Sequence, residues 1–252
     1  MEPFKRPLAC ISDLVLPRTC TVCGRRLLSF EKHICTSCLA DLPLTFNWAL
    51  PHNAMADRFN ERIQENLFKD GEQSCFPGRH IPYCYATSLF FFNSEALYRH
   101  IPYSVKYRMD IPLGLFFGRM LGEMICLSPV LGDIDMVIPV PLHWTRKWKR
   151  GYNQAEVIAR GIAGRIHADL CTGILFRSRR TATQTRLDIK GKEDNVRSAF
   201  AARKSIPPGI RHILLVDDVF TTGATLYACW QAVRTVSRDT RISIATLALV
   251  SN

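Results

Sequence analysis

The sequence predicts an α/β protein in which a parallel sheet with helices on both faces follows a small four-cysteine module. Two observations lead to this prediction. From about Tyr83 onward, short apolar segments alternate with segments of helical periodicity, and strands that are apolar throughout are typical of a parallel sheet covered on both sides. Before that point, four cysteines lie in two close pairs, as metal ligands often do.

The chain divides into three parts by its composition and hydrophobic pattern. We expect a metal module at 1–50, a polar connector at 51–82 with one short helix at Arg58–Phe68, and the sheet domain at 83–252. In the sheet domain, apolar runs predict strands at Cys84–Phe92, Met136–Val140, Ile213–Val216 and Ile242–Val250. Apolar residues three or four apart predict helices at Ser94–Val105, Leu113–Ile125, Gln154–His167 and Ala224–Val236.

Composition and charge narrow the class of protein. The 252 residues are 47% hydrophobic and 22% charged, which is ordinary for a soluble globular protein. A net charge of +11 suits a phosphorylated metabolite or a nucleic acid, although a basic surface that serves only solubility is a third reading. No apolar run approaches the roughly 18 residues that span a bilayer, so we expect no membrane insertion. The residues after Met1 lack the apolar core of a signal peptide, and we therefore expect a cytoplasmic location.

The two cysteine pairs predict a structural zinc site. Cys20 and Cys23, like Cys35 and Cys38, are separated by two residues, and two such pairs supply the four tetrahedral sulfur ligands that zinc prefers. Gly24 suits the tight turn after the first pair. The alternatives are redox dithiols or unliganded cysteines, but a redox pair would lie between a strand and a helix, and only one would be expected. Four sulfur ligands leave no open position for catalysis, so the site is structural.

The segment Ile213–Thr225 predicts a phosphate site. A buried strand brings Asp217 and Asp218 to the carboxyl end of the sheet, where α/β proteins bind ligands. The turn that follows opens a helix, and its backbone N–H groups and hydroxyls suit a phosphate monoester. The residues of this predicted phosphate turn are Thr221, Thr222, Gly223, Ala224 and Thr225. The two acids suit a ribose diol, with a divalent cation bridging to a diphosphate. The simpler reading is an ordinary turn followed by a capped helix.

A second segment carries a dense cluster of cations in front of a predicted helix. Val137–His143 is a strand and loop, and the residues from Arg146 to Gln154 follow it. Lys147, Lys149 and Arg150 are positioned to hold a diphosphate, and Gly151 would expose backbone amides to it. The alternative is a solvated basic loop with Trp144 and Trp148 packed beneath it.

These blocks together resemble a known family. The Asp217–Thr225 segment resembles the motif with which type I phosphoribosyltransferases bind phosphoribosyl diphosphate (PRPP). The ordered blocks Pro139–His143, Arg150–Gln154, Arg180–Leu187 and Asp217–Thr225, behind a four-cysteine module, resemble the ComF family. The resemblance implies a type I phosphoribosyltransferase-like fold behind a zinc finger, and a link to DNA uptake in natural competence. It implies PRPP with Mg²⁺ as ligand, Asp217 and Asp218 as catalytic residues, and Arg150 and Gly151 beside the diphosphate.

The resemblance leaves two functions open, a phosphoribosyltransferase with an unknown acceptor and a non-catalytic binding module on the same fold. The second would bind single-stranded DNA or another competence protein such as a helicase. Its nucleic-acid contacts are expected at Lys106, Arg108, Arg146, Lys147 and Arg180. By analogy, the segment 179–195 would be a mobile flap over PRPP. Two features depart from the family: Met109 stands where glycine is usual, and residues 51–82 lack a clear second zinc knuckle.

Overall fold

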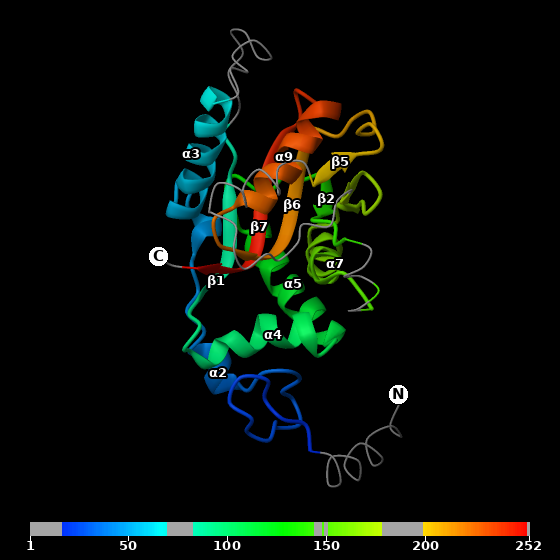
Figure 1. The fold of residues 1–252 in the computed structure, drawn as a ribbon. Helices are drawn as coiled ribbons and strands as arrows, with labels where there is room; N and C mark the ends of the chain where they lie inside the picture. Colours follow the sequence, from blue (N-terminus) through cyan, green and yellow to red (C-terminus); the bar gives the residue numbers. More distant parts are fainter. Residues whose placement is uncertain (1–16, 70–82, 144–147, 149–150, 178–198, 251–252) are drawn as a thin grey trace, which may run out of the picture.

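The centre of the molecule is a five-stranded sheet in which every neighbouring pair of strands is parallel. The computed structural model describes residues 17–69, 83–143, 148, 151–177 and 199–250. The strand order is β1-β7-β6-β2-β3 (Figure 1). These strands are β1 (Ala86–Phe92), β2 (Met136–Pro139), β3 (Asp169–Leu170), β6 (His212–Phe220) and β7 (Arg241–Val250). A separate antiparallel ribbon pairs β4 (Leu175–Arg177) with β5 (Phe200–Ala202).

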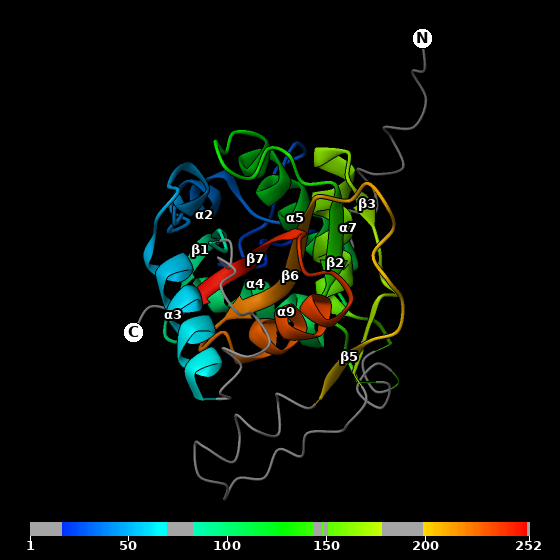
Figure 2. The same cartoon turned by 90° about the horizontal axis from the view of Figure 1, so that it is seen from above.

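Helices cover both faces of this sheet, which confirms the predicted fold class (Figure 2). On one side lie α5 (Ile111–Cys126) and α7 (Gln154–Ile166), and on the other α3 (Ala54–Lys69) and α9 (Ala224–Val236). Side chains alternate along β6, so that Leu214 and Val216 join the core of the first side and Ile213 and Leu215 that of the second. All four side chains are fully buried, which explains the unbroken apolar run in the sequence.

Close packing fixes α7, and with it the loop that precedes it, against α5. Gly118 of α5 lies so near α7 that a Cβ there would be 2.5 Å from the Ile158 carbonyl oxygen. Gly161 of α7 is equally close to α5, since its Cβ would lie 2.8 Å from the Leu115 carbonyl oxygen. These glycines therefore set the distance between the two helices.

The strand order places a switch point between β2 and β6. From β2 the chain crosses to β3 on one side, whereas from β6 it crosses to β7 on the other. The loops that follow the carboxyl ends of β2 and β6 therefore leave the sheet side by side and diverge, and ligands of doubly wound proteins bind in the crevice that this opens. Both segments with predicted phosphate chemistry follow these two strands.

The four-cysteine module packs directly against the sheet domain. It contains α2 (Thr36–Ala40), and it lies beneath α4 (His100–Tyr107) in Figure 1. Val22, Ile34 and Leu42 of the module share one buried core with Phe117 and Leu121 of α5. The short helix η1 (Asn47–Ala49) then leads the chain to α3.

Helix α3 differs from the connector that the sequence predicts. It begins at Ala54 and ends at Lys69, earlier and later than the expected Arg58–Phe68, and Asn53 caps it by accepting the Ala56 N–H at 3.0 Å. Met55, Phe59 and Ile63 are buried against α9 and the sheet. Polar residues of the predicted connector, such as Glu61 and Glu65, lie on the exposed face of this amphipathic helix.

The other predicted elements are present with shifted ends. Pro102 has no N–H to donate, so α4 begins at His100, just before it, and Leu97–Arg99 form the short helix η3 instead of a first helical turn. Strand β6 runs four residues past Val216 because β7 continues to pair with it as far as Phe220. In the described part of the chain, no helix is both long and apolar enough to cross a membrane.

Candidate functional site

The acid pair lies in β6, just past the end of its neighbour β2. The last backbone bond to that side is donated by Val140 N–H to the Val216 carbonyl at 2.8 Å. Asp217 and Asp218 follow, and they stay paired with β7 on the other side. Asp217 Oδ1 accepts the Asp218 backbone N–H at 2.8 Å, which holds the two acids in a defined relation.

A lysine from α4 neutralises part of this charge. Lys106 Nζ lies 2.8 Å from Asp218 Oδ2, and the side chains of Lys106 and Asp218 are 31% and 13% exposed. Burial alone would lower the pKa of Lys106, but attraction by Asp218 and Asp217 outweighs it and raises that pKa. The lysine therefore stays cationic at the centre of the site.

Asp217 is the acid whose protonation is tuned. Burial and the charge of Asp218 together raise its pKa to about 7, although the Asp218 N–H and Lys106 act in the opposite direction. A carboxyl group with such a pKa exchanges protons near neutral pH, which is typical of functional sites. A cation bound beside the pair would favour its ionised form.

The predicted phosphate turn follows β6 and begins α9. Thr221 and Thr222 are exposed, and Gly223 precedes the helix in the left-handed region with φ of +74°. The first helical bond runs from Tyr227 N–H to the Gly223 carbonyl at 2.8 Å, so the N–H groups of the preceding residues have no acceptor within the helix. These N–H groups and the helix dipole can bind an anion.

Two arginines of α3 donate hydrogen bonds to the backbone of this turn. Arg58 Nη2 donates to the Thr221 carbonyl at 2.9 Å, and Arg62 Nε donates to the Thr222 carbonyl at 2.8 Å. The Arg58 guanidinium also lies over the Phe220 ring, 5.6 Å from its centroid. Sequence reasoning missed both arginines because it treated their helix as a connector, although their spacing of four places them on one helical face.

The second basic segment returns to the same edge of the sheet. Asn153 Nδ2 donates to the Val140 carbonyl at 3.0 Å, and Gln154 Nε2 donates to the Lys106 carbonyl at 3.3 Å. Gly151 has φ of +76° and is exposed. The predicted site residues Arg146, Lys147, Arg150 and Arg180 and the predicted flap 179–195 lie outside the described residues.

The turn after α4 contacts this segment. Met109 adopts φ of +57°, and its Cε lies 3.4 Å from where a Cβ on Gly151 would stand. The left-handed backbone explains why glycine is usual at this position in the family that the sequence resembles, since methionine keeps the turn at some cost in strain. Arg108, one residue earlier, is exposed and lines a cavity with Lys106.

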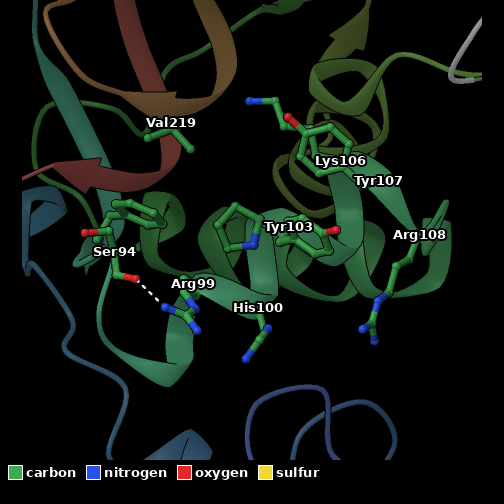
Figure 3. Close-up of a pocket in the computed structure, with 10 residues that line it drawn as sticks. Ser94, Arg99, His100, Tyr103, Lys106, Tyr107, Arg108 and Val219 are labelled. Carbon is green, nitrogen blue, oxygen red and sulfur yellow. Dashed lines mark hydrogen bonds between the residues drawn. The ribbon is translucent and has the colours of Figure 1, made fainter.

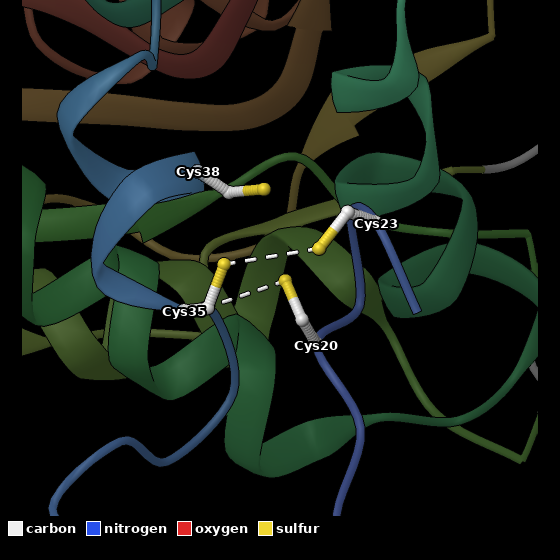
Figure 4. Close-up of side chains that lie close together, drawn as sticks. All are labelled: Cys20, Cys23, Cys35 and Cys38. Atoms are coloured by element: carbon white, nitrogen blue, oxygen red, sulfur yellow. Dashed lines mark hydrogen bonds between the residues drawn. The ribbon is translucent and has the colours of Figure 1, made fainter. Parts of the chain in front are cut away.

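The four cysteine sulfurs of the module converge (Figure 4). Those of Cys20, Cys23, Cys35 and Cys38 all lie within 4.8 Å of one another, and the Cys23–Cys35 separation is 3.8 Å. Four sulfurs about 2.3 Å from a tetrahedral ion are about 3.8 Å apart, so the cluster fits one metal ion.

Backbone N–H groups support the thiolate form in this cluster. The Cys35 N–H donates to Cys20 Sγ at 3.3 Å. Burial acts to raise the pKa of Cys20, but hydrogen bonds from the backbone outweigh it and lower that pKa to about 7. The Cys20 thiol is therefore prepared for metal binding, since the thiolate is the ligand.

Fold and site define a doubly wound α/β protein with an acid pair and a glycine turn before a helix at its switch point, joined to a module whose four cysteines could hold a metal ion. Over 94 residues the chain is 39% identical to competence protein F of Haemophilus influenzae, a match that covers 36% of this chain and 41% of that protein. Over 92 residues it is 37% identical to DNA utilization protein YhgH of Shigella flexneri, covering 36% of this chain and 40% of that protein. These relatives confirm the predicted ComF-type resemblance, and the chain matches about 40% of their length.

Two further comparisons complete this picture. No family model matches the chain. Among solved structures, the allosteric regulatory enzyme of purine biosynthesis is similar with a TM-score of 0.36 and 18% identity, over 58% of this chain and 30% of that one.

Proposed function

We propose that the chain is a PRPP-binding, phosphoribosyltransferase-like protein of the ComF type that serves the handling of incoming DNA in the cytoplasm. One observation carries the proposal: Asp217 and Asp218 are joined directly to the Gly223 turn at the switch point of the sheet. The turn provides N–H groups for the 5′-phosphate, and the acids suit the two ribose hydroxyls. The names of the relatives support the link to DNA.

Each part of the site has a separate role in this proposal. Residues 221–225 hold the 5′-phosphate, and Gly151 with Arg150 lies beside the diphosphate. Mg²⁺, when bound, supplies positive charge to the diphosphate. Because Lys106 already pairs with Asp218 at 2.8 Å, it competes with any cation that binds there.

Calorimetry with PRPP and Mg²⁺ tests this proposal. The wild type should bind PRPP, and Asp217→Asn combined with Asp218→Asn should abolish binding because both ribose acceptors lose their charge. Asp169→Asn is a matched control, since this exposed acid begins β3 at the opposite end of the strands. Absence of PRPP binding by the folded wild type would refute the proposal.

Single-stranded DNA binding without turnover is the second candidate. The relatives' names and the net charge of +11 favour it. Among the proposed contacts, the structure describes Lys106 and Arg108, and Arg108 is exposed. Fluorescence anisotropy with a labelled oligonucleotide tests this candidate. Binding should weaken steeply as salt rises, because phosphate contacts release counterions, and salt-independent or absent binding would count against it.

We also propose that the metal of the four-cysteine cluster is zinc and that it is structural. The four sulfurs close its coordination shell, and thiolates are the ligands that select zinc. Mass spectrometry of the intact protein should find one zinc ion per chain. A well-folded protein that lacks zinc would contradict this assignment.

A further inference from the structure

A cavity of about 590 Å³ lies along α4, where Lys106 and Val219 are among the residues that line it (Figure 3). It is bounded by the end of β1 at Phe92, by Val219 of β6 and by the length of α4. Its volume lies in the range of small-molecule sites, roughly 300 to 1,000 Å³. Lys106 lines it and also pairs with Asp218, so the cavity adjoins the acid pair through one side chain.

The charged lining of this cavity is cationic. Arg99, Lys106 and Arg108 contribute to it beside the imidazole of His100, and none of the described residues that line it is acidic. Arg99 Nη1 donates to the Ser94 carbonyl at 2.8 Å, which fixes the guanidinium at the rim. Arg99 and His100 lie on one side of Tyr103 and Arg108 on the other (Figure 3). Three cations with no acid among the described lining residues favour an anionic ligand.

Two tyrosines stand between these cations. Tyr103 and Tyr107 are one helical turn apart on α4, with ring centroids 4.9 Å apart and planes inclined at 43°. They are 49% and 58% exposed, so about half of each side chain is open to a ligand. Exposed rings between cations are the arrangement with which proteins stack nucleobases while holding the adjoining phosphates.

We propose that this cavity binds a nucleotide, with its base against Tyr103 and Tyr107 and its phosphates held by Arg99, His100 and Arg108. The volume suits a nucleotide better than a lone base. The cavity is separate from the turn proposed to hold PRPP, so the inference stands without that proposal. Where both hold, the base lies beside the acid pair, across Lys106. The nucleotide can be free or part of a single strand, since both present a ring and phosphate.

Binding of three probes to the full-length protein, measured by calorimetry, tests this inference. The probes are thymidine 5′-monophosphate, 2-deoxyribose 5-phosphate and an oligothymidylate ten nucleotides long. The variants are Tyr103→Leu, which removes the ring but keeps apolar bulk, and Arg108→Gln. Their matched controls are Phe46→Leu, a 57% exposed ring elsewhere, and Arg160→Gln, an exposed cation of α7.

The wild type should bind the monophosphate or the oligonucleotide, and the sugar phosphate at least tenfold more weakly. Tyr103→Leu should weaken binding by roughly tenfold, the size of a lost base stack, and Arg108→Gln should weaken it by a similar factor. The two controls should bind as the wild type does. Binding of the oligonucleotide alone would identify a strand as the source of the nucleotide.

Three results would overturn the inference: no binding of either nucleotide probe, equal binding of the sugar phosphate, or unchanged binding by Tyr103→Leu. A PRPP titration separates this inference from the proposed function. Asp217→Asn with Asp218→Asn should lose PRPP and keep the nucleotide, whereas Tyr103→Leu should do the reverse. If the wild type binds a nucleotide probe but does not bind PRPP, the result would support the proposed nucleotide cavity and refute only the proposed PRPP site.

Discussion

Gly223 is the residue on which the predicted phosphate turn depends, and replacing it with alanine tests the turn directly. Two features oppose a side chain there. The backbone has φ of +74°, in the region that favours glycine. A Cβ would also lie 2.9 Å from Cε2 and Cζ of the Phe220 ring and 3.3 Å from Cδ2 of Phe59. Both rings are buried, so neither can move aside without disturbing the core.

The magnitude follows from these two features. A left-handed alanine costs about 1–2 kcal/mol, and forcing one extra carbon into a packed site costs about 1–3 kcal/mol. Gly223→Ala should therefore lower the free energy of unfolding by about 2–5 kcal/mol. Gly209→Ala is the matched control, because Gly209 has φ of +91° but no atom within 4 Å of its Cβ position. It should lose only the backbone part, about 1–2 kcal/mol.

Equilibrium unfolding in urea measures both changes. In a Phe220→Leu background, which removes the two nearest ring atoms, Gly223→Ala should cost less than it does in the wild type and approach the cost of Gly209→Ala. Gly223→Ala should also weaken PRPP binding, because the turn must shift, whereas Gly209→Ala should not. Equal losses of stability for the two glycine variants while Phe220 is present would refute the packing argument. An unchanged cost of Gly223→Ala after Phe220→Leu would refute it as well.

Three further predictions concern the metal, the acid pair and a buried histidine. Zinc removal by a chelator, or Cys35→Ser, should lower the melting temperature measured by circular dichroism, because the module shares its core with α5; an unchanged transition with zinc lost would contradict this. Lys106→Met should raise the pKa of Asp217 above about 7, measured by carboxyl NMR, because it removes a cation that lowers it. An unshifted titration would exclude that role. Burial lowers the pKa of His212 below its value in the unfolded chain, so His212 stabilises the fold fully above about pH 6.5 and progressively less as pH falls. Stability of the wild type relative to His212→Gln should therefore decrease between pH 7.5 and 5.5, and a constant difference would show that His212 plays no part.

The fold was largely predictable because its strands and helices are long and regularly patterned. Helix α9 has the predicted bounds, and β7 begins one residue before the predicted strand. Strands β3, β4 and β5 were not predicted, since two or three residues are too few to show a period. Helix α3 was underestimated because its polar face outweighs the apolar residues Met55, Phe59 and Ile63 in the composition.

Some features of the candidate site also follow from local sequence motifs, whereas others depend on contacts between segments far apart in the sequence. The cysteine cluster and the turn at Gly223 are local motifs, and their sequence patterns alone predict a metal site and a turn that opens a helix. The ion pair of Lys106 with Asp218 and the bond from Arg58 to Thr221 join segments far apart in the sequence. Only the packing of α4 and α3 against the sheet brings Lys106 to the acid pair and Arg58 to the turn. No rule based on sequence spacing could therefore reveal these two contacts.

The metal module and the acid pair are connected through continuous packing. Cys20 and Cys35 are buried in the same core as Phe117 of α5. Helix α5 begins at Ile111, and Asp110 caps it by accepting the Leu113 N–H at 3.0 Å. Residues 108–110 join it to α4, the helix that carries Lys106. Ile101 and Val105 of α4 are buried in the same core. Because of this continuous packing, we expect loss of the four-cysteine fold to disturb the position of the cation that balances the acid pair.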